Sequence, residues 1–225
     1  MTGRLLLFLA SVSFLLRWSS QDPGILRDLL DGLEKRGARL VRDEGAPSRP
    51  VVELDLHRVN MTDRTLEQVC SIPTLRLLDL SHTQITDKGM AFLPRLKGLE
   101  ELTLHNTGIS DLGLKSVAKL ANLRLLDLAD TSIGDGGMAH LSGLAHLETL
   151  ELDNTRVGDK GLAHLKGLSR LRRLTLPHTL VTDQGVKDLG RLKDLEVVNL
   201  YRTRMTPAGF RELRSLLPGC GVEGD

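Results

Sequence analysis

Residues 75–98 read LRLLDLSHTQITDKGMAFLPRLKG, and the same pattern returns every 24 residues in the stretches that begin at Leu99, Leu123, Leu147 and Leu171. The shared pattern is L-x-x-L-x-L-x-x-T-x-(I/V)-(T/S/G)-D-x-G-(M/L/V)-x-x-(L/V)-x-x-L. No residue is inserted or deleted between Val51 and Pro218. A unit that recurs at a fixed spacing indicates a repeated supersecondary element, so the period decides the architecture before any other signal.

Each unit predicts a strand followed by a short helix. Leu78 and Leu80 alternate with polar neighbours such as Asp79, which is the two-residue period of a short strand buried on one face. The apolar spacing then changes to three residues, which suits a short helix or 3₁₀ turn, at Met90, Leu93 and Leu96. One repeat is therefore strand, turn, helix and return loop.

The residues at the strand-to-helix junction have predicted structural roles. The last repeat reads Thr206-Pro207 where an earlier one reads Thr86-Asp87, and proline is favoured at the first helical position. The hydroxyl residue is then the expected N-cap, and the aspartate lies beside the positive end of the helix dipole. Gly89 and its equivalents indicate a close approach to the neighbouring coil or a special dihedral angle. Because these residues recur in every coil, we interpret them as structural and not catalytic.

On these motifs the chain resembles leucine-rich repeat proteins, in particular the ribonuclease-inhibitor-like and bacterial 24-residue classes. The resemblance covers about three quarters of the chain, with threonine where many such repeats carry Asn or Cys, at Thr83, Thr107, Thr131, Thr155, Thr179 and Thr203. It implies an α/β leucine-rich-repeat solenoid, with a parallel sheet on the concave face and short helices on the convex face. It also implies a protein-binding role without catalytic residues or cofactors.

We predict four segments along the chain. Residues 1–20 form a signal-like or anchor-like apolar segment, and residues 21–50 an N-terminal cap of helix, short strand and loop. Residues 51–218 form seven 24-residue repeats, and residues 219–225 a C-terminal cap and tail. In the N-terminal cap, Pro23 opens a helix that Gly37 ends, with an apolar face at Ile25, Leu26, Leu29, Leu30 and Leu33.

The first twenty residues bear on the compartment. Arg4 precedes the apolar run from Leu5 to Leu16, and Arg17 closes it. Twelve residues are too few for an unaided transmembrane helix, which needs about 20, but they fit the core of a secretory signal. We expect export or membrane anchoring through residues 1–20. The alternative is a cytoplasmic protein whose N-terminus has another role.

Composition and motif spacing exclude several classes of function. A formal net charge of +1 and 3% aromatic residues argue against a nucleic-acid partner. Cys70 and Cys220 are separated by too many coils to form a disulfide bond. The chain has no P-loop, no G-x-S-x-G motif and no helical His-x₃-His spacing, so we expect no cofactor and no metal.

The concave strand face is the surface on which neighbouring repeats differ, so we look for function there. It carries an excess of acids, and in register Asp55 should neighbour Asp79, and Asp127 should neighbour Glu151. A basic partner, a cation or solvent could relieve their repulsion. Toward the C-terminal end, Arg173 and Tyr201 are typical of protein interfaces. The candidate partner-binding residues are Asp55, Asp79, Glu101, Asp127, Glu151, Asp153, Arg173, Tyr201 and Arg202.

The sequence therefore predicts a monomeric, non-catalytic solenoid that binds a protein through its concave face. One alternative is a substrate-receptor subunit of a ubiquitin ligase, although the region before Val51 has no recognisable F-box. The other alternative is a hydrolytic enzyme. It is disfavoured because nearly every candidate acid or nucleophile in the sequence belongs to the repeat pattern.

Overall fold

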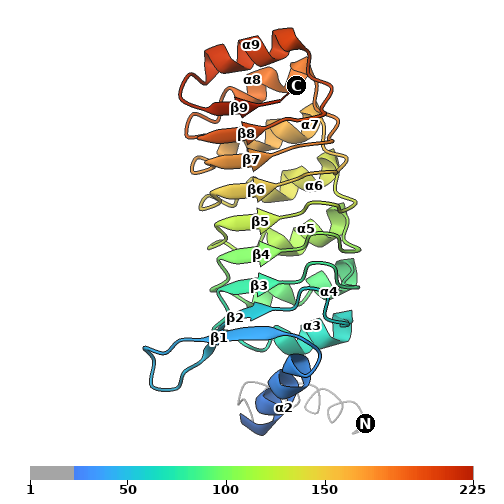
Figure 1. The fold of residues 1–225 in the computed structure, drawn as a ribbon, viewed down its shortest axis with the longest axis vertical. Helices are drawn as coiled ribbons and strands as arrows, with labels where there is room; N and C mark the ends of the chain where they lie inside the picture. Colours follow the sequence, from blue (N-terminus) through green and yellow to red (C-terminus); the bar gives the residue numbers. More distant parts are fainter. Residues whose placement is uncertain (1–22, 225) are drawn as a thin grey trace, which may run out of the picture.

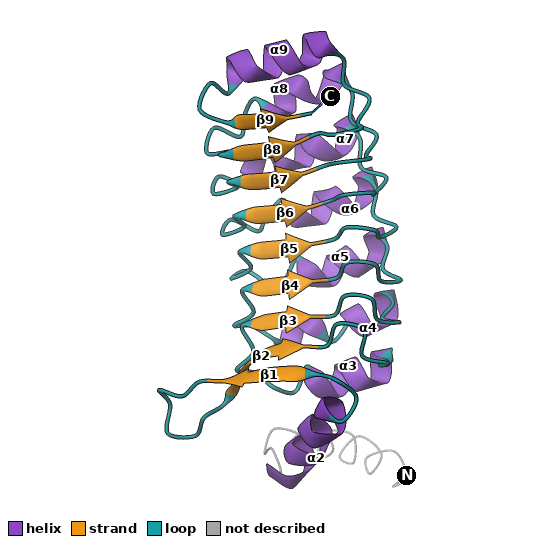
Figure 2. Cartoon of the chain, viewed as in Figure 1, coloured by secondary structure: helices purple, strands orange, loops and turns teal. Residues whose placement is uncertain are grey.

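The computed structural model describes residues 23–224, so the expected signal or anchor at residues 1–20 lies outside the described residues. The strands stack into one ladder and the helices lie behind it, so the molecule is an elongated two-layer body (Figure 1). Figure 2 shows the same division into a strand layer and a helix layer. Within residues 23–224, every helix is too short or too polar to cross a membrane.

Nine strands form a single sheet in sequence order, β1 to β9. The first pair, β1 and β2, is antiparallel, and every later pair is parallel. The strands are β1 (Arg39–Arg42), β2 (Val51–Asp55), β3 (Leu77–Asp79), β4 (Glu101–Thr103), β5 (Leu125–Asp127), β6 (Thr149–Glu151), β7 (Arg173–Thr175), β8 (Val197–Asn199) and β9 (Gly221–Glu223).

Each parallel strand pair brackets at least one short helix, as the change of apolar spacing predicts. The α-helices are α2 (Pro23–Glu34), α3 (Asp63–Val69), α4 (Asp87–Met90), α5 (Asp111–Val117), α6 (Asp135–Met138), α7 (Asp159–Leu162), α8 (Val186–Leu189) and α9 (Pro207–Leu216). Short 3₁₀ turns extend or precede four of them: η1 (Leu93–Arg95), η2 (Ala139–Leu141), η3 (Ala163–Gly167) and η4 (Asp183–Gly185). The α/β leucine-rich-repeat architecture is confirmed.

The core is one continuous apolar stack between the two layers. The middle residue of each inner strand points into it, and the register aligns Leu78, Leu102, Leu126 and Leu150, all fully buried. In every coil from β3 onward, the repeated threonine donates a hydrogen bond from Oγ1 to the carbonyl oxygen three residues earlier, as Thr83 does to Leu80 at 2.6 Å. This bond satisfies a buried hydroxyl inside the coil and explains why threonine serves at that position.

The repeated aspartates form a ladder that joins each coil to the next. Asp87 begins α4, but its Oδ1 accepts a hydrogen bond from the Ser110 backbone N–H at 2.8 Å, and its Oδ2 accepts from the Ser110 hydroxyl at 2.6 Å. The equivalent acceptors are Asp63, Asp111, Asp135, Asp159 and Asp183. We name these six residues the aspartate ladder. The predicted N-cap role of the hydroxyl residue is confirmed at Thr86, Ser110, Thr182 and Thr206.

The repeated glycines leave room for this ladder. A Cβ atom at Gly113 would lie 2.7 Å from Asp87 Oδ1, and the Gly113 N–H itself donates to that oxygen at 3.0 Å. Gly113 lies in helix α5 with a negative φ, so close approach and not a special dihedral excludes a side chain here. Gly37 is the different case, because its φ of 100° ends α2 in the left-handed region.

The ends of the array are covered by atypical elements. Helix α2 buries Leu30 and Leu33, but Ile25 is 67% exposed. The predicted apolar face therefore begins one turn too early along the helix. Ile25 lies in the first turn of α2, away from the buried Leu30 and Leu33. At the other end, β9 extends the sheet beside β8, and Pro207 takes the position of the ladder aspartate.

Candidate functional site

The candidate site is the exposed side of the sheet, which we call the open sheet face: the outward strand positions and the exposed residues of the turn that follows each strand. One column of this face runs through residues 55, 79, 103, 127, 151, 175 and 199. We name its four acids, Asp55, Asp79, Asp127 and Glu151, the acidic column. The predicted adjacency of Asp55 to Asp79, and of Asp127 to Glu151, is confirmed by the strand register.

Asp127 and Glu151 are the electrostatic centre of this column. Partial burial raises the pKa of Asp127, and the charges of Asp153 and Asp79 raise it further. The hydrogen bond from the Ala129 N–H and the charge of His105 lower this pKa. Partial burial and the Asp127 charge likewise raise the pKa of Glu151. Among residues 23–224, no ion pair within 4.0 Å includes either carboxylate. The ionised forms of these two neighbouring carboxylates are therefore disfavoured, and a bound cation would stabilise them.

The three aspartates of the acidic column also have a local structural role. The side chains of Asp55, Asp79 and Asp127 each accept a hydrogen bond from the backbone N–H two residues later, at 2.8 to 2.9 Å. Asn199 makes the same bond to Tyr201 at 3.1 Å. This turn bond fixes the carboxylate at the end of each strand, so the column has a defined geometry.

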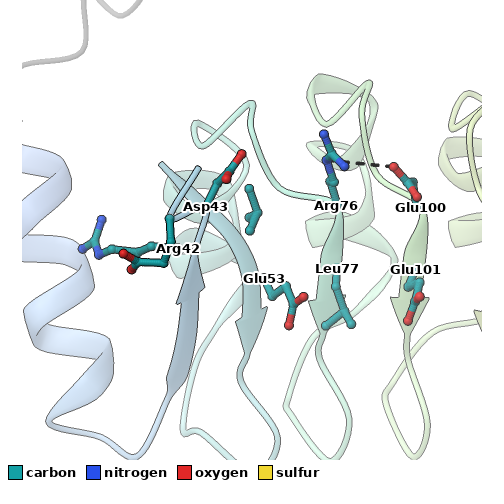
Figure 3. A pocket seen from close by; sticks show the side chains of 9 residues that line it. Arg42, Asp43, Glu53, Arg76, Leu77, Glu100 and Glu101 are labelled. Atoms are coloured by element: carbon teal, nitrogen blue, oxygen red, sulfur yellow. Dashed lines mark ion pairs between the residues drawn. The ribbon is translucent and has the colours of Figure 1, made fainter. Parts of the chain in front are cut away.

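Glu101 lies in a different column from the acidic column, beside Leu77 of the preceding strand. It lines a shallow cavity of about 430 Å³ with Glu53, Arg76 and Glu100. Figure 3 shows Glu53, Leu77 and Glu101 projecting from three successive strands, with Arg76 directed toward Glu100. The cavity therefore presents one carboxylate on each side of an apolar side chain.

Asp153 follows β6 and is tied to the next coil. It accepts a short hydrogen bond from the Thr175 hydroxyl, and Asn154 beside it donates a short bond to Asp130. Asp130 also lies 3.5 Å from His105 Nε2. These contacts connect the coils of the open sheet face along its edge, next to the acidic column.

The C-terminal part of the open sheet face carries the basic and aromatic candidates. Arg173 lies in β7 and is exposed. Tyr201 and Arg202 were expected on the last strands, but they lie in the turn after β8, because β8 ends at Asn199. Tyr201 is 46% exposed, so it does not pack fully against the C-terminal cap. Arg202 adopts a φ of 55°, and the residue at this position of every coil from β2 onward has a φ between 51° and 59°.

Two arrangements escaped the sequence interpretation. Three imidazoles stack across coils, with ring centroids 4.9 Å apart for His57 and His82 and 4.8 Å apart for His82 and His105. A second arrangement alternates arginine and glutamate just before the strands, and it pairs Arg76 with Glu100, Arg124 with Glu148 and Arg172 with Glu196. The alternating L-R and L-E starts of the repeats were a visible signal for the second arrangement.

A metal centre is not formed by the described part of the chain: residues 23–224 contain no group of three or more His, Cys, Asp or Glu side chains arranged to hold a metal ion. Cys70 is buried and Cys220 half-buried, and both are free thiols. Burial raises the pKa of Cys70 to about 12, which keeps this thiol protonated and unreactive.

A sequence profile of the leucine rich repeat family matches residues 73–133 and 97–157. Together with the observed coils, this match supports a leucine-rich repeat protein. A search of curated proteins found no significant match. Proteins of this fold typically serve as non-catalytic interaction modules. These findings give no support to the ubiquitin-ligase alternative.

Solved structures with the same fold include two internalins of Listeria monocytogenes str. 4b F2365. The chain superposes on internalin InlF with a TM-score of 0.66 and 24% identity, covering 77% of this chain and 47% of that one. For internalin C2 the TM-score is 0.61 and the identity 22%, covering 78% and 74% of the two chains. PEPR1, in the PEPR1-AtPEP1 structure, gives 0.54 and 17%, covering 80% and 26%. At these identities the likeness establishes the fold alone, and the chain spans about half of InlF.

Proposed function

We propose that this protein is a binding module whose open sheet face receives a lysine- or arginine-rich segment of a partner protein. The observation that carries the proposal is the pairing of Asp127 with Glu151 on adjacent strands. These carboxylates are neighbours in register, half-buried, and raised in pKa by burial and by like charge. Carboxylates whose pKa is raised by burial and by a neighbouring charge are candidates for functional sites.

A cationic side chain between these carboxylates would remove their mutual repulsion and favour their ionised forms. Complementary charge mainly accelerates association and selects the partner, whereas a few well-packed anchors slow dissociation. Tyr201 is our candidate for the second role, because it is exposed at the C-terminal end of the same face. The acidic column and Tyr201 therefore divide recognition into an electrostatic part and an anchoring part.

The experiment uses an octalysine peptide as the probe and surface plasmon resonance as the readout. The triple variant Asp79→Asn/Asp127→Asn/Glu151→Gln should lower the association rate about tenfold at low salt and flatten its salt dependence. Its matched control, Asp28→Asn/Asp194→Asn/Glu212→Gln, removes the same number and kind of charges outside the open sheet face. Equal losses in the two triple variants would show that only net charge matters and would reject the site.

Tyr201→Ala tests the anchoring part separately. It should raise the dissociation rate of a peptide in which lysines alternate with leucines, with little effect on association. If variants of Lys88, Lys115 or Lys160 on the helical side change binding while these do not, the functional surface is on the opposite side of the molecule.

We further propose that residues 1–20 direct export or anchor the protein in a membrane. The support is the sequence pattern alone, namely Arg4 followed by the apolar run from Leu5 to Leu16. A fusion of residues 1–24 to a reporter that is active only outside the cytoplasm should be active. A silent reporter would favour the cytoplasmic alternative.

A further inference from the structure

The three stacked imidazoles form a continuous ladder at the N-terminal end of the open sheet face. His57, His82 and His105 follow β2, β3 and β4, and we name them the histidine ladder. The interplanar angle is 78° between the His57 and His82 rings and 67° between the His82 and His105 rings, so each contact is edge to face. Imidazoles this close cannot all be protonated without mutual repulsion, so their titrations depend on one another.

Charged groups of both signs surround the histidine ladder. Partial burial is the largest cause that lowers the pKa of His82. The charges of His105, Arg58 and His57 lower this pKa further, and the charge of Asp130 raises it. Asp130 Oδ2 lies 3.5 Å from His105 Nε2. Asn106 Nδ2 lies 2.7 Å from His82 Nδ1. A charge on His82 is therefore disfavoured, and Asp130 provides an acidic neighbour for His105.

The histidine ladder is electrostatically connected to the acidic column. His57 and His82 follow the strands that end in Asp55 and Asp79, and His105 follows β4, whose last residue Thr103 pairs with Asp127 of β5. The charge of His105 counteracts the rise in pKa of both Asp127 and Glu151. A proton gained by His105 thus acts on the same carboxylates as a cation from a partner.

We propose that the histidine ladder makes binding at the open sheet face dependent on pH, with a basic partner held near pH 7.5 and released near pH 5.5. Unperturbed histidine titrates at about pH 6.5, between these two values. This inference rests on the proposed function, because it concerns the regulation of that same site.

Competition between protons and partner follows from reciprocal coupling. If the bound cationic segment lowers the pKa of the coupled histidines by a total of one unit, acidification lowers the affinity by the same factor, which is about tenfold. Above the histidine pKa the imidazoles are neutral and the acidic column alone sets the local field. Below it, protonated imidazoles of the histidine ladder supply positive charge beside the acidic column and the basic segment is displaced.

The experiment measures the affinity of the full-length protein for an octalysine peptide by calorimetry at pH 7.5, 6.5 and 5.5, at constant ionic strength. The test variant is His57→Ser/His105→Ser, since Ser81 occupies the equivalent position in the coil between them. The control variant is His140→Ser/His164→Ser, on the helical side. Circular dichroism checks that each variant is folded.

We expect the affinity of the parent protein and of the control variant to fall about tenfold from pH 7.5 to 5.5, and that of the test variant to fall less than about threefold. The residual pH dependence of the test variant belongs to Asp127 and Glu151. An unchanged tenfold fall in the test variant, or a parent affinity independent of pH, would overturn the inference. Absence of binding even at pH 7.5 would instead overturn the proposed function.

A second measurement uses the parent protein without substitutions. Proton NMR titration of the histidine ring signals should show His82 titrating at lower pH than the exposed His164. Saturating octalysine peptide should move the His105 titration to lower pH and leave that of His164 unchanged. If His105 and His164 respond equally to the peptide, the histidine ladder is not coupled to binding.

Discussion

The aspartate ladder and the acidic column are two sets of acids repeated at the same coil spacing, yet their electrostatic settings are opposite. Hydrogen bonds from the Thr206 hydroxyl and backbone N–H lower the pKa of Asp183 in the aspartate ladder. Burial and like charge raise the pKa of Glu151 in the acidic column. Donors from the next coil meet the first set, whereas in the second set Asp55 and Asp127 meet a carboxylate of the next coil. The role of a repeated acid is therefore decided by what the next coil offers it.

The largest effect on the free energy of unfolding should come from a core leucine that directly follows a residue of the acidic column. Leu128 is fully buried one residue after Asp127, so Leu128→Ala should lower the free energy of unfolding by about 2 to 5 kcal/mol. Asp127→Asn, on the opposite side of the chain, should change it far less. Urea denaturation measures both, and similar losses would contradict the strand register.

The next effect should come from the aspartate ladder. Asp87→Ala removes the acceptor of the Ser110 N–H, the Ser110 hydroxyl and the Gly113 N–H, so it should lower the free energy of unfolding by about 1 to 3 kcal/mol. Asp87→Asn retains one carbonyl oxygen and should lose less. If urea denaturation shows that Asp87→Ala costs no more than Asp79→Ala, the distinction between ladder and face is wrong.

The smallest effect should have the opposite sign and come from the acidic column. Because the folded state raises the pKa of Glu151 above its usual value of 4.5, the folded protein binds more protons than the unfolded chain just above that pH. Its stability contribution is therefore lost as pH rises through the raised pKa. Glu151→Gln should stabilise the protein at pH 7, by less than about 1 kcal/mol because solvent screens this half-exposed group.

Glu196→Gln is the matched control for that substitution. Glu196 pairs with Arg172 at 2.8 Å, so its removal should bring no gain at pH 7. Thermal or urea unfolding at pH 4.5 and pH 7 compares the two variants. A gain for Glu196→Gln equal to that for Glu151→Gln would attribute the effect to net charge instead of local repulsion.

The sequence predicts the interior of this molecule better than its junctions. The period places Leu78 and Leu126 in the core because burial depends only on the apolar pattern of each coil. The partner of Asp87 could not be predicted in the same way, because the bond crosses 23 residues and depends on the stacking distance between coils. A local helix-cap rule points to α4 itself, whereas the donors belong to the next coil.

The candidate site shows the same division. Register alone brings Asp127 beside Glu151, so this contact follows from the period. The histidine ladder depends on a backbone detail, since His82 reaches its neighbours from a position with a φ of 56° in the turn after β3. Tyr201 falls in the equivalent turn after β8 because the strands are only three residues long. Turn geometry is what the repeat pattern leaves undetermined.

Because arginine and glutamate alternate before the strands, the solenoid should be lengthened or shortened by two coils at a time instead of one. Deleting residues 99–122 would place Arg76 beside Arg124, two like charges where an ion pair now stands. Deleting residues 99–146 would place Arg76 beside Glu148 and keep the alternation. Solenoids engineered from this sequence should therefore tolerate insertions and deletions in steps of 48 residues, twice the 24-residue period, better than in single steps.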